Sequence, residues 1–253
     1  MKAVQKKKRH IRKAILVPLI FILCVILGTG GFYGVKGYRM YREAIEERSI
    51  ADRVEEIRGA ENFVSYSELP EFYIDATISV EDHRFKKHWG IDIMAVGRAA
   101  WTDLKAMSFV EGGSTITQQI VKNMLFTQEK KMERKAAEVF AVLELESKYT
   151  KEEIFELYVN NTDFGSGYRG IYQAAMGYFG KEPLQLTDYE SAMLAGIPNA
   201  PSVYSPDISK ELAYHRVQKV LESMVDNQVI TQKQADEIEQ DAEEQSKEEE
   251  NNE

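Results

Sequence analysis

The pattern of apolar and polar positions predicts a chain built mainly from helices. Residues 14–35 contain no charged side chain, whereas residues 36–60 are charged and favour helix. From about residue 92 onward the apolar spacing is helical with few strand signals, and residues 73–80 fit either a short strand or the start of a buried helix. Capping boxes mark three helix starts, at Thr150 with Glu153, Thr187 with Glu190, and Thr231 with Gln234. We therefore expect a mostly α fold.

The uncharged segment 14–35 is long enough to cross a membrane. Its 22 residues would span roughly 33 Å as a helix, about the thickness of a bilayer core. Seven Lys or Arg side chains lie within residues 1–13, which favours a cytoplasmic N-terminus. A cleaved signal peptide is the alternative, but its apolar core would be shorter and would end at a small-residue cleavage site, which we do not find.

Charge and composition divide the whole chain into segments. We expect a basic tail over 1–13, a membrane helix over 14–35, a stalk or linker helix over 36–59, one globular domain over 60–240 and a disordered acidic tail over 241–253. Without its basic tail the chain holds 25 Lys or Arg against 41 Asp or Glu, a net charge of −16, so a nucleic-acid partner is not expected. The single Cys24 excludes an intramolecular disulfide.

The first cluster of chemically active residues is Glu81–Gly90. It contains two acids, Glu81 and Asp82, two histidines and three cations. A carboxylate walled by Phe85 would have a raised pKa and could act as a general base. A solvated surface turn is the alternative, and metal ligation by histidines five residues apart lacks a third ligand in a clear pattern.

The second cluster is the segment 112–123, which begins with two glycines. Ser114 or Thr115 can cap the following helix, and the free N–H groups at its start suit an anion such as phosphate. Gln119 and Lys122 are three residues apart and share a helix face. An ordinary capped helix is the alternative.

A third pair of residues, Arg134 and Glu138, lies four apart on a predicted helix. The pair is either a surface ion pair or a phosphate-binding arginine held by its carboxylate partner. Between the first two clusters, the apolar residues of 94–110 form either a core helix or an exposed flap that touches lipid.

Five segments in fixed order resemble the motif regions of the peptidoglycan glycosyltransferases, the transglycosylase domains of class A penicillin-binding proteins and their stand-alone relatives. The segments are EDHRFKKHWG, GGSTITQQIVKN, RKAAEVFAVLELE, IFELYVNNTDFGSGYRGIYQAAMGYFGK and LTDYESAMLAGIPNAPSVYSP. They cover about residues 60–225. Asp163 departs from the family pattern, where an aromatic or aliphatic residue is usual.

The resemblance implies a lysozyme-like helical domain with a large lobe and a small membrane-facing jaw, to which residues 101–110 would belong. It implies two catalytic-site carboxylates, Glu81 as general base and Glu138. It implies that the substrate is bound by Asp82, Ser114, Thr115, Gln119, Lys122, Asn123 and Arg134. No cofactor is expected to be required, and a divalent cation at the pyrophosphate is left open.

The implied reaction is the polymerisation of lipid II into linear glycan strands, with inversion, new β-1,4 bonds and release of undecaprenyl pyrophosphate. Because Ser-x-x-Lys and Lys-Thr-Gly motifs are both absent from the sequence, we expect a monofunctional enzyme without transpeptidase activity. Lipid II, the growing glycan chain and membrane lipid are the expected partners, and other cell-wall synthases are candidates. The expected location is the bacterial cell membrane, with a single span and the catalytic domain outside. A lysozyme-like hydrolase and a non-catalytic wall-assembly protein are the rival functions.

Overall fold

A computed structural model describes residues 2–106, 113–126 and 132–252. The expectation of a mostly helical fold is confirmed. The longer helices are α1 (Lys2–Glu47), α2 (Ile50–Arg58), α3 (Glu71–Glu81), α4 (Ile93–Ala106), α5 (Ile116–Leu125), α6 (Met132–Lys148), α7 (Lys151–Asn161), α8 (Ile171–Phe179), α9 (Asp188–Gly196), α11 (Lys210–Asp226) and α12 (Gln232–Asn252). The short ones are α10 (Pro201–Tyr204) and the 3₁₀ turns η1 (Tyr66–Glu68), η2 (Phe85–Lys87), η3 (Pro183–Gln185) and η4 (Ile197–Asn199).

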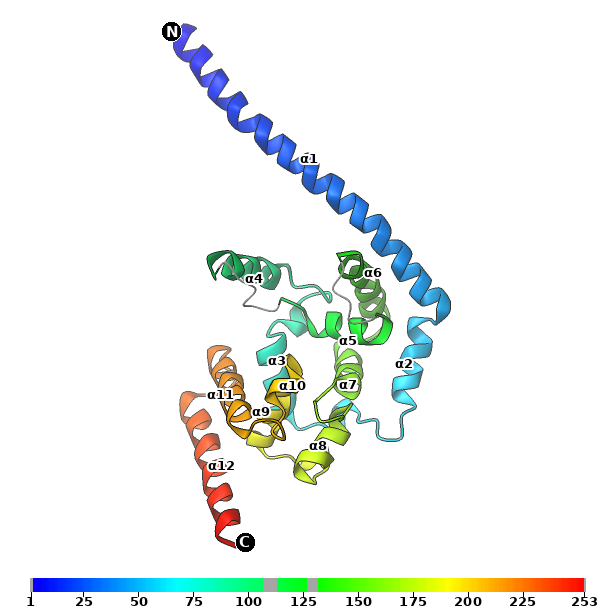
Figure 1. The fold of residues 1–253 in the computed structure, drawn as a ribbon, viewed down its shortest axis with the longest axis vertical. Helices are drawn as coiled ribbons and strands as arrows, with labels where there is room; N and C mark the ends of the chain where they lie inside the picture. The colour runs from blue at the N-terminus through cyan, green and yellow to red at the C-terminus, as the bar shows by residue number, and fades with distance from the viewer. Residues whose placement is uncertain (1, 107–112, 127–131, 253) are drawn as a thin grey trace.

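The core of the domain has two groups of packed helices. Helix α3 packs against α9 and α11, and α5 packs against α6 and α7 (Figure 1). Phe155 of α7 joins the two groups, since its ring contacts both Tyr73 of α3 and Phe85 of η2. All three rings are fully buried. The core therefore fixes the end of α3 relative to α5 and α6.

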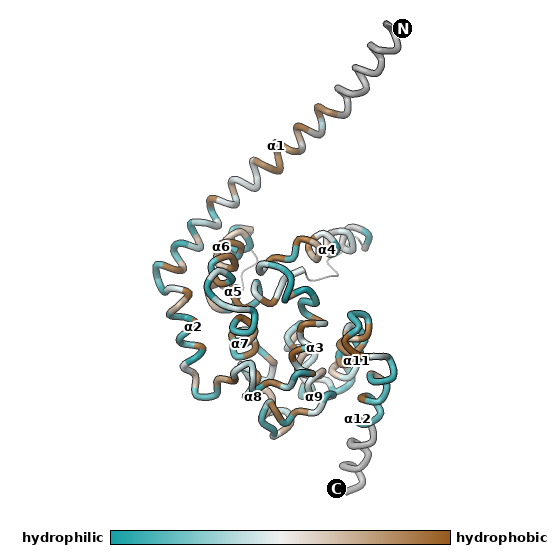
Figure 2. The backbone as a smooth tube through the Cα atoms, turned by 180° about the vertical axis from the view of Figure 1, so that it is seen from behind, coloured by the Kyte–Doolittle hydropathy of each residue, from teal (hydrophilic) through white to brown (hydrophobic). Residues whose placement is uncertain are grey.

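Helix α1 projects from this core and carries the apolar segment. Figure 2 shows its hydrophobic middle portion well away from the packed helices. One helix among the described residues, over Leu16–Glu47, is long and apolar enough to cross a membrane. After the apolar segment, α1 continues unbroken to Glu47 and packs along α6.

The helix boundaries agree with the capping signals. At Thr150 and Thr187 the hydroxyl accepts from the third backbone N–H of the helix, and the Glu at that position returns a bond. Thr231 and Gln234 make the same reciprocal contacts at the start of α12. Residues 73–80 are helix, inside α3.

The C-terminal segment differs from the expected disordered tail. Helix α12 continues past Gln240 to Asn252. This segment is rich in Glu, Gln, Lys and Ala, which have high intrinsic helix propensity even where no apolar face is available. Asp163 lies in a local turn, where its carboxylate accepts from the N–H of Gly165 at 2.8 Å and its backbone bridges Arg169.

Candidate active site

Glu81 is the last residue of α3, and its carboxylate is nearly enclosed. Its side chain is 9% exposed. Oε2 accepts a hydrogen bond from Nε2 of Gln119 at 2.7 Å. Oε1 has no hydrogen-bond partner among the described residues, and Nη2 of Arg216 lies 3.7 Å from it. One oxygen is therefore held by a hydrogen bond, and the other is buried without a hydrogen-bond donor among the described residues.

The surroundings of Glu81 raise its pKa. Burial is the largest cause, and the neighbouring carboxylate of Asp82 acts in the same direction. The hydrogen bond from Gln119 and the charges of Arg216 and Lys122 oppose this rise. A buried carboxylate with a raised pKa beside an open cavity is the environment expected for a general base.

Helix α5 brings Gln119 and Lys122 to the same cavity, as their spacing predicts. Burial lowers the pKa of the Lys122 ammonium, and Arg134 and Lys135 lower it further, whereas Glu138 and Glu81 raise it. Among the described residues, no carboxylate forms an ion pair with Lys122 within 4.0 Å. Its charge is therefore available to an anionic ligand.

The start of α5 is held by hydrogen bonds within the protein. Thr115 is the N-cap, and its hydroxyl accepts from the N–H of Gln118 at 3.1 Å while donating to the carbonyl of Gly90 at 2.6 Å. The N–H of Ile116 donates to Oδ2 of Asp82 at 3.1 Å. The N–H of Ile116 at this helix start is thus engaged by the protein's own carboxylate, while Ser114 and Thr115 still line the cavity, and phosphate binding here stays a prediction. Gly112 lies outside the described residues.

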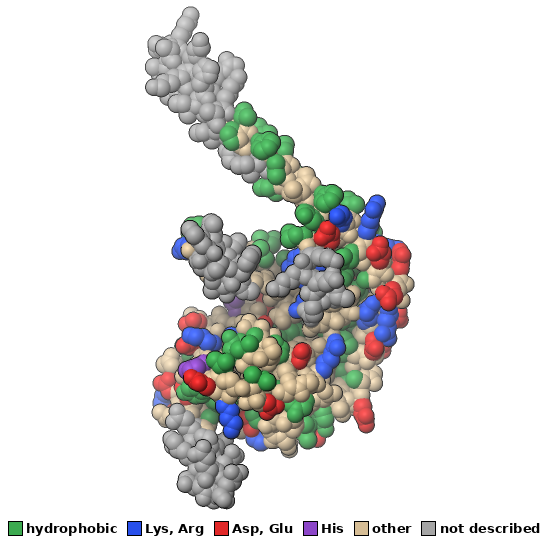
Figure 3. Space-filling model, viewed as in Figure 1, with side chains coloured by type: hydrophobic (Ala, Val, Ile, Leu, Met, Phe, Trp, Pro, Cys, Tyr) green, Lys and Arg blue, Asp and Glu red, His purple; other side chains and the backbone are tan. Residues whose placement is uncertain are grey.

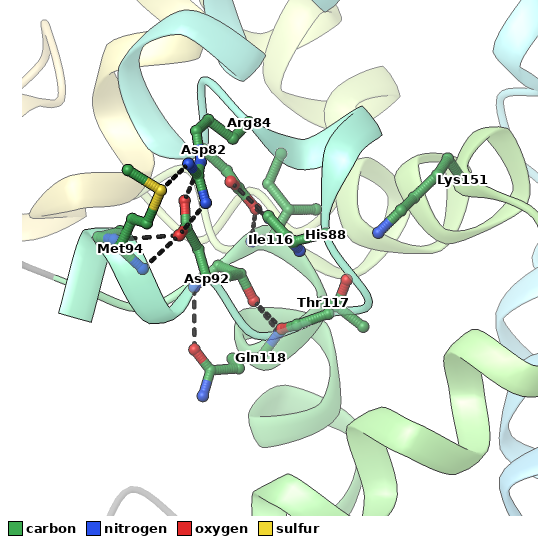
Figure 4. A network of polar contacts seen from close by, with 12 residues as sticks. Asp82, Arg84, His88, Asp92, Met94, Ile116, Thr117, Gln118 and Lys151 are labelled. Carbon is green, nitrogen blue, oxygen red and sulfur yellow. Dashed lines mark hydrogen bonds and ion pairs between the residues drawn. The ribbon is translucent and has the colours of Figure 1, made fainter. Parts of the chain in front are cut away.

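Asp82 belongs to a buried network that fixes the segment after α3 (Figure 4). Nε2 of His88 lies 2.9 Å from Oδ1 of Asp82, and both side chains are buried. Asp92 accepts from Arg84 at 2.7 and 2.9 Å and from two backbone N–H groups at the start of α4. Although burial raises the pKa of Asp92, these hydrogen bonds and the charge of Arg84 lower it overall.

This network also bears on metal binding. Ligand atoms of Asp82, His88 and Asp92 lie within 4.8 Å of one another. The cluster contains His88 but not His83, so it is not the histidine pair considered from the sequence. Both carboxylates are already engaged by Arg84, Ile116 and His88. We therefore assign the cluster a structural role, and the absence of a metal from the site stays a prediction.

Glu138 and Arg134 are not a surface pair. Glu138 is 1% exposed and forms ion pairs with Arg134 and, at 2.9 Å, with Lys135. Nζ of Lys135 also donates to Oγ of Ser114 at 3.1 Å. A buried carboxylate flanked by two cations holds both of them in place. Together with Lys122 they make this side of the site electropositive.

A cavity of about 680 Å³ is lined by both Glu81 and Lys122. Of the residues selected from the sequence, the cavity lining includes Glu81, Asp82, Ser114, Thr115, Gln119 and Lys122. Asn123, Arg134 and Glu138 are not in the lining, although the charge of Glu138 raises the pKa of Lys122. Figure 3 shows the surface recessed below α4. The opposite wall comes from the region of η4 and α11, through Asn199, Asp226 and Asn227.

Arg216 is the main site residue that we did not select from the sequence. Its Nε donates to the carbonyl of Gly196 at 3.0 Å, and its guanidinium lies over the ring of Tyr204. These contacts aim it at Glu81. The sequence signal that could identify Arg216 is a cation beside the apolar stripe of α11, in which Val217 and Val220 are fully buried.

Helix α4 forms one rim of the cavity and exposes apolar side chains. Ala95 and Arg98 line the cavity, while Ile93, Met94 and Trp101 are exposed. This exposure agrees with the expected flap rather than with a core helix. Residues 107–110 of the flap lie outside the described residues.

Comparison with known proteins identifies the family. Residues 48–225 match the family model described as transglycosylase. The chain belongs to the transglycosylase family. It is 45% identical over 172 residues to penicillin-binding protein 1F of Bacillus subtilis, and 35% identical over 227 residues to penicillin-binding protein 2D of the same organism. Penicillin-binding protein 1A of Aquifex aeolicus is 41% identical over 175 residues.

These transglycosylase relatives are much longer proteins. The matches cover 68%, 89% and 69% of this chain but only 24%, 33% and 24% of the relatives. A crystal structure of penicillin-binding protein 1A from Haemophilus influenzae is also similar, with a TM-score of 0.42 and 23% identity over 70% of this chain and 17% of that one. The family supports glycan polymerisation in peptidoglycan synthesis in general terms.

Proposed function

We propose that this transglycosylase polymerises lipid II, with Glu81 as the general base. The observation that carries the proposal is the asymmetry of the Glu81 carboxylate, with Oε2 held by Gln119 and Oε1 without a hydrogen bond. Oε1 would accept the proton of the acceptor sugar's 4-hydroxyl. The resulting oxygen attacks C1 of the donor sugar from the face opposite the lipid pyrophosphate, and the C1–O bond to pyrophosphate breaks with inversion.

The leaving pyrophosphate carries concentrated negative charge, which cations stabilise as it develops. Lys122 supplies one such charge at the cavity wall, and Glu138 holds Arg134 and Lys135 beside it. This arrangement makes Glu138 an orienting carboxylate, because its oxygens face cations rather than the cavity. The donor is already activated, so no nucleotide is consumed.

We also propose that the N-terminus is cytoplasmic and that the domain lies outside the bacterial cell membrane. The basic residues before the apolar part of α1 support this orientation. The exposed apolar side chains of α4 would then contact membrane lipid. The protein is expected to act without transpeptidation, alone or beside other cell-wall synthases, and the chelator arm of the assay below tests for a divalent cation at the pyrophosphate.

The test is polymerisation of purified lipid II by the full chain, with and without chelator, followed by gel separation of the glycan. Glu81→Gln should fold and bind lipid II but form no polymer, because an amide cannot accept the proton. Polymer at the wild-type rate would refute the base assignment. Release of muropeptides from purified sacculi would instead indicate a hydrolase.

Glu138→Gln separates orientation from direct chemistry. It leaves the cations in place but removes the charge that holds them, so a loss smaller than that of Glu81→Gln is expected in the same assay. A loss as deep as that of Glu81→Gln would contradict the orienting role.

A further inference from the structure

The end of α1 crosses α6 at very short range. Gly37 is buried against α6, and a Cβ placed on it would lie 2.5 Å from the Cβ of Ala136 and 2.7 Å from the backbone N of Ala137. A side chain at position 37 is therefore incompatible with this packing. Gly34, one turn earlier, has open space around it.

Further contacts extend this crossing along both helices. Nζ of Lys36 lies 3.1 Å from Oε1 of Glu133. The ring of Phe140 contacts the rings of Tyr38 and Tyr41 at centroid distances of 5.3 and 6.0 Å. The Tyr41 hydroxyl donates to Glu144, and burial with this carboxylate raises the pKa of Tyr41 to about 12. We call the set from Lys36–Glu133 to Tyr41–Glu144 the anchor seam.

The anchor seam uses one face of α6, and the site uses another. Glu133, Ala136, Phe140 and Glu144 recur at spacings of three and four and form one stripe. Arg134 and Glu138 lie on the flank directed toward the core and Lys122. One rigid helix thus connects the membrane anchor to the cations of the site.

The anchor seam begins close to the end of the apolar segment of α1. Gly37 follows the last residue of the uncharged segment, Val35, by two residues, or about 3 Å of helix rise. Arg134 precedes Ala136 by two residues, so it lies near the same level. Because α1 has no break between the apolar segment and Glu47, no flexible linker separates the bilayer from the site.

We propose that the anchor seam holds Arg134 and Lys135 at the level of the lipid headgroups, with Gly37 as the positioning residue. The inference rests on the proposed function, since the phosphates of a membrane-borne polyprenyl pyrophosphate lie at that level. With the cations at this level, the pyrophosphate would be bound while the polyprenyl chain stays in the bilayer. The anchor seam would act on the reaction by setting the height and orientation of the domain relative to the membrane. It does not contact the reacting atoms.

The first experiment changes height while leaving the seam intact. A charged seven-residue helical insert, EKAAEKA, is placed between Val35 and Lys36. It adds about 10 Å along the helix axis and turns the domain by only about 20°. The matched control carries the same insert between Lys8 and Arg9, before the apolar segment. Rates on lipid II are measured in vesicles and in detergent micelles.

The insert after Val35 should lower the rate in vesicles at least tenfold and the rate in micelles less than twofold, because a lipid in a micelle can adjust to the raised site. The control insert should match the wild type in both. Equal rates for the two inserts in vesicles would overturn the proposal, as would equal losses in vesicles and micelles. A wild-type chain inactive in both media would instead count against the proposed function.

A second experiment breaks the seam itself. Gly37→Leu should dissociate α1 from α6, whereas Gly34→Leu is the matched control on the same helix. We expect Gly37→Leu to lower the vesicle-to-micelle rate ratio at least fivefold with its pH profile unchanged. A ratio equal to that of Gly34→Leu would refute the role of Gly37. Thermal melting identifies a variant that has simply unfolded, and the insert then remains the deciding test.

Discussion

Replacing Gln119 with Met should test how the base is held. The side chains are similar in length, but Met cannot donate the 2.7 Å hydrogen bond from Nε2 to Oε2 of Glu81. Glu81 is buried, so water cannot easily replace this donor. A hydrogen bond to a charged group contributes about 1.5–3 kcal/mol. If that energy stabilises the ionised base, its loss should lower kcat/KM by about 10- to 150-fold at a pH well below the wild-type pKa of Glu81, where the carboxyl is mostly protonated.

The pH dependence of kcat/KM tests the direction of this effect. The Gln119 hydrogen bond lowers the pKa of Glu81 against the larger effect of burial, so removing it should raise that pKa further. The acid limb of the kcat/KM profile should move to higher pH, and activity should recover partly as pH increases. A uniform loss at all pH values would indicate that Gln119 acts on substrate binding instead.

A double-mutant cycle supplies the control. In a Glu81→Asp background the base remains but its oxygens are displaced, so Gln119→Met should cost less there than in the wild type. The assay is the rate of glycan formation from lipid II between pH 5 and 9, with thermal melting of each variant. A profile for Gln119→Met that superimposes on the wild-type profile would refute the reasoning.

Three further outcomes follow from the same contacts. Arg216→Met removes a charge that lowers the pKa of Glu81, so its acid limb should also move to higher pH, while Arg216→Lys should retain most of the wild-type profile. Burial raises the folded-state pKa of Glu81 above its unfolded value, so the folded protein loses stability as pH rises between the two values. Glu81→Gln should therefore be more stable than the wild type at pH 8 in urea unfolding. The difference between the two proteins should shrink toward pH 4. Gly90 has a φ of +76° and would clash with Val142 if it carried a Cβ, so Gly90→Ala should lower the free energy of unfolding by about 1–3 kcal/mol, and an unchanged urea midpoint would contradict the strain.

Much of the fold could be predicted because its signals are local. Capping boxes such as Thr150 with Glu153 fix helix starts through contacts three residues apart. The segment 73–80 was ambiguous because a short apolar run fits a strand or a buried helix equally, and packing against α9 and α11 decides the matter. Helix α12 extends beyond Gln240 because this segment is rich in residues of high helix propensity, although few of them are apolar.

The site was predictable where spacing along one helix places residues together. Gln119 and Lys122 reach the cavity as expected, and the buried Glu138 holds Arg134 on the next helix. Arg216 was missed because its contact with Glu81 joins positions 135 residues apart along the chain, and no local pattern reports such a contact. The contact between Asp82 and the start of α5 was missed for the same reason.

That contact has a consequence for how kinetic data on this protein are interpreted. Asp82 follows the base directly in sequence, yet its carboxylate supports the helix that carries Gln119. A severe rate loss after replacement of Asp82 would therefore not distinguish lost proton transfer from a displaced partner of the base. Adjacent acids in a sequence motif can divide the work, one for chemistry and one for scaffolding, so equal sensitivity to mutation does not show equal roles.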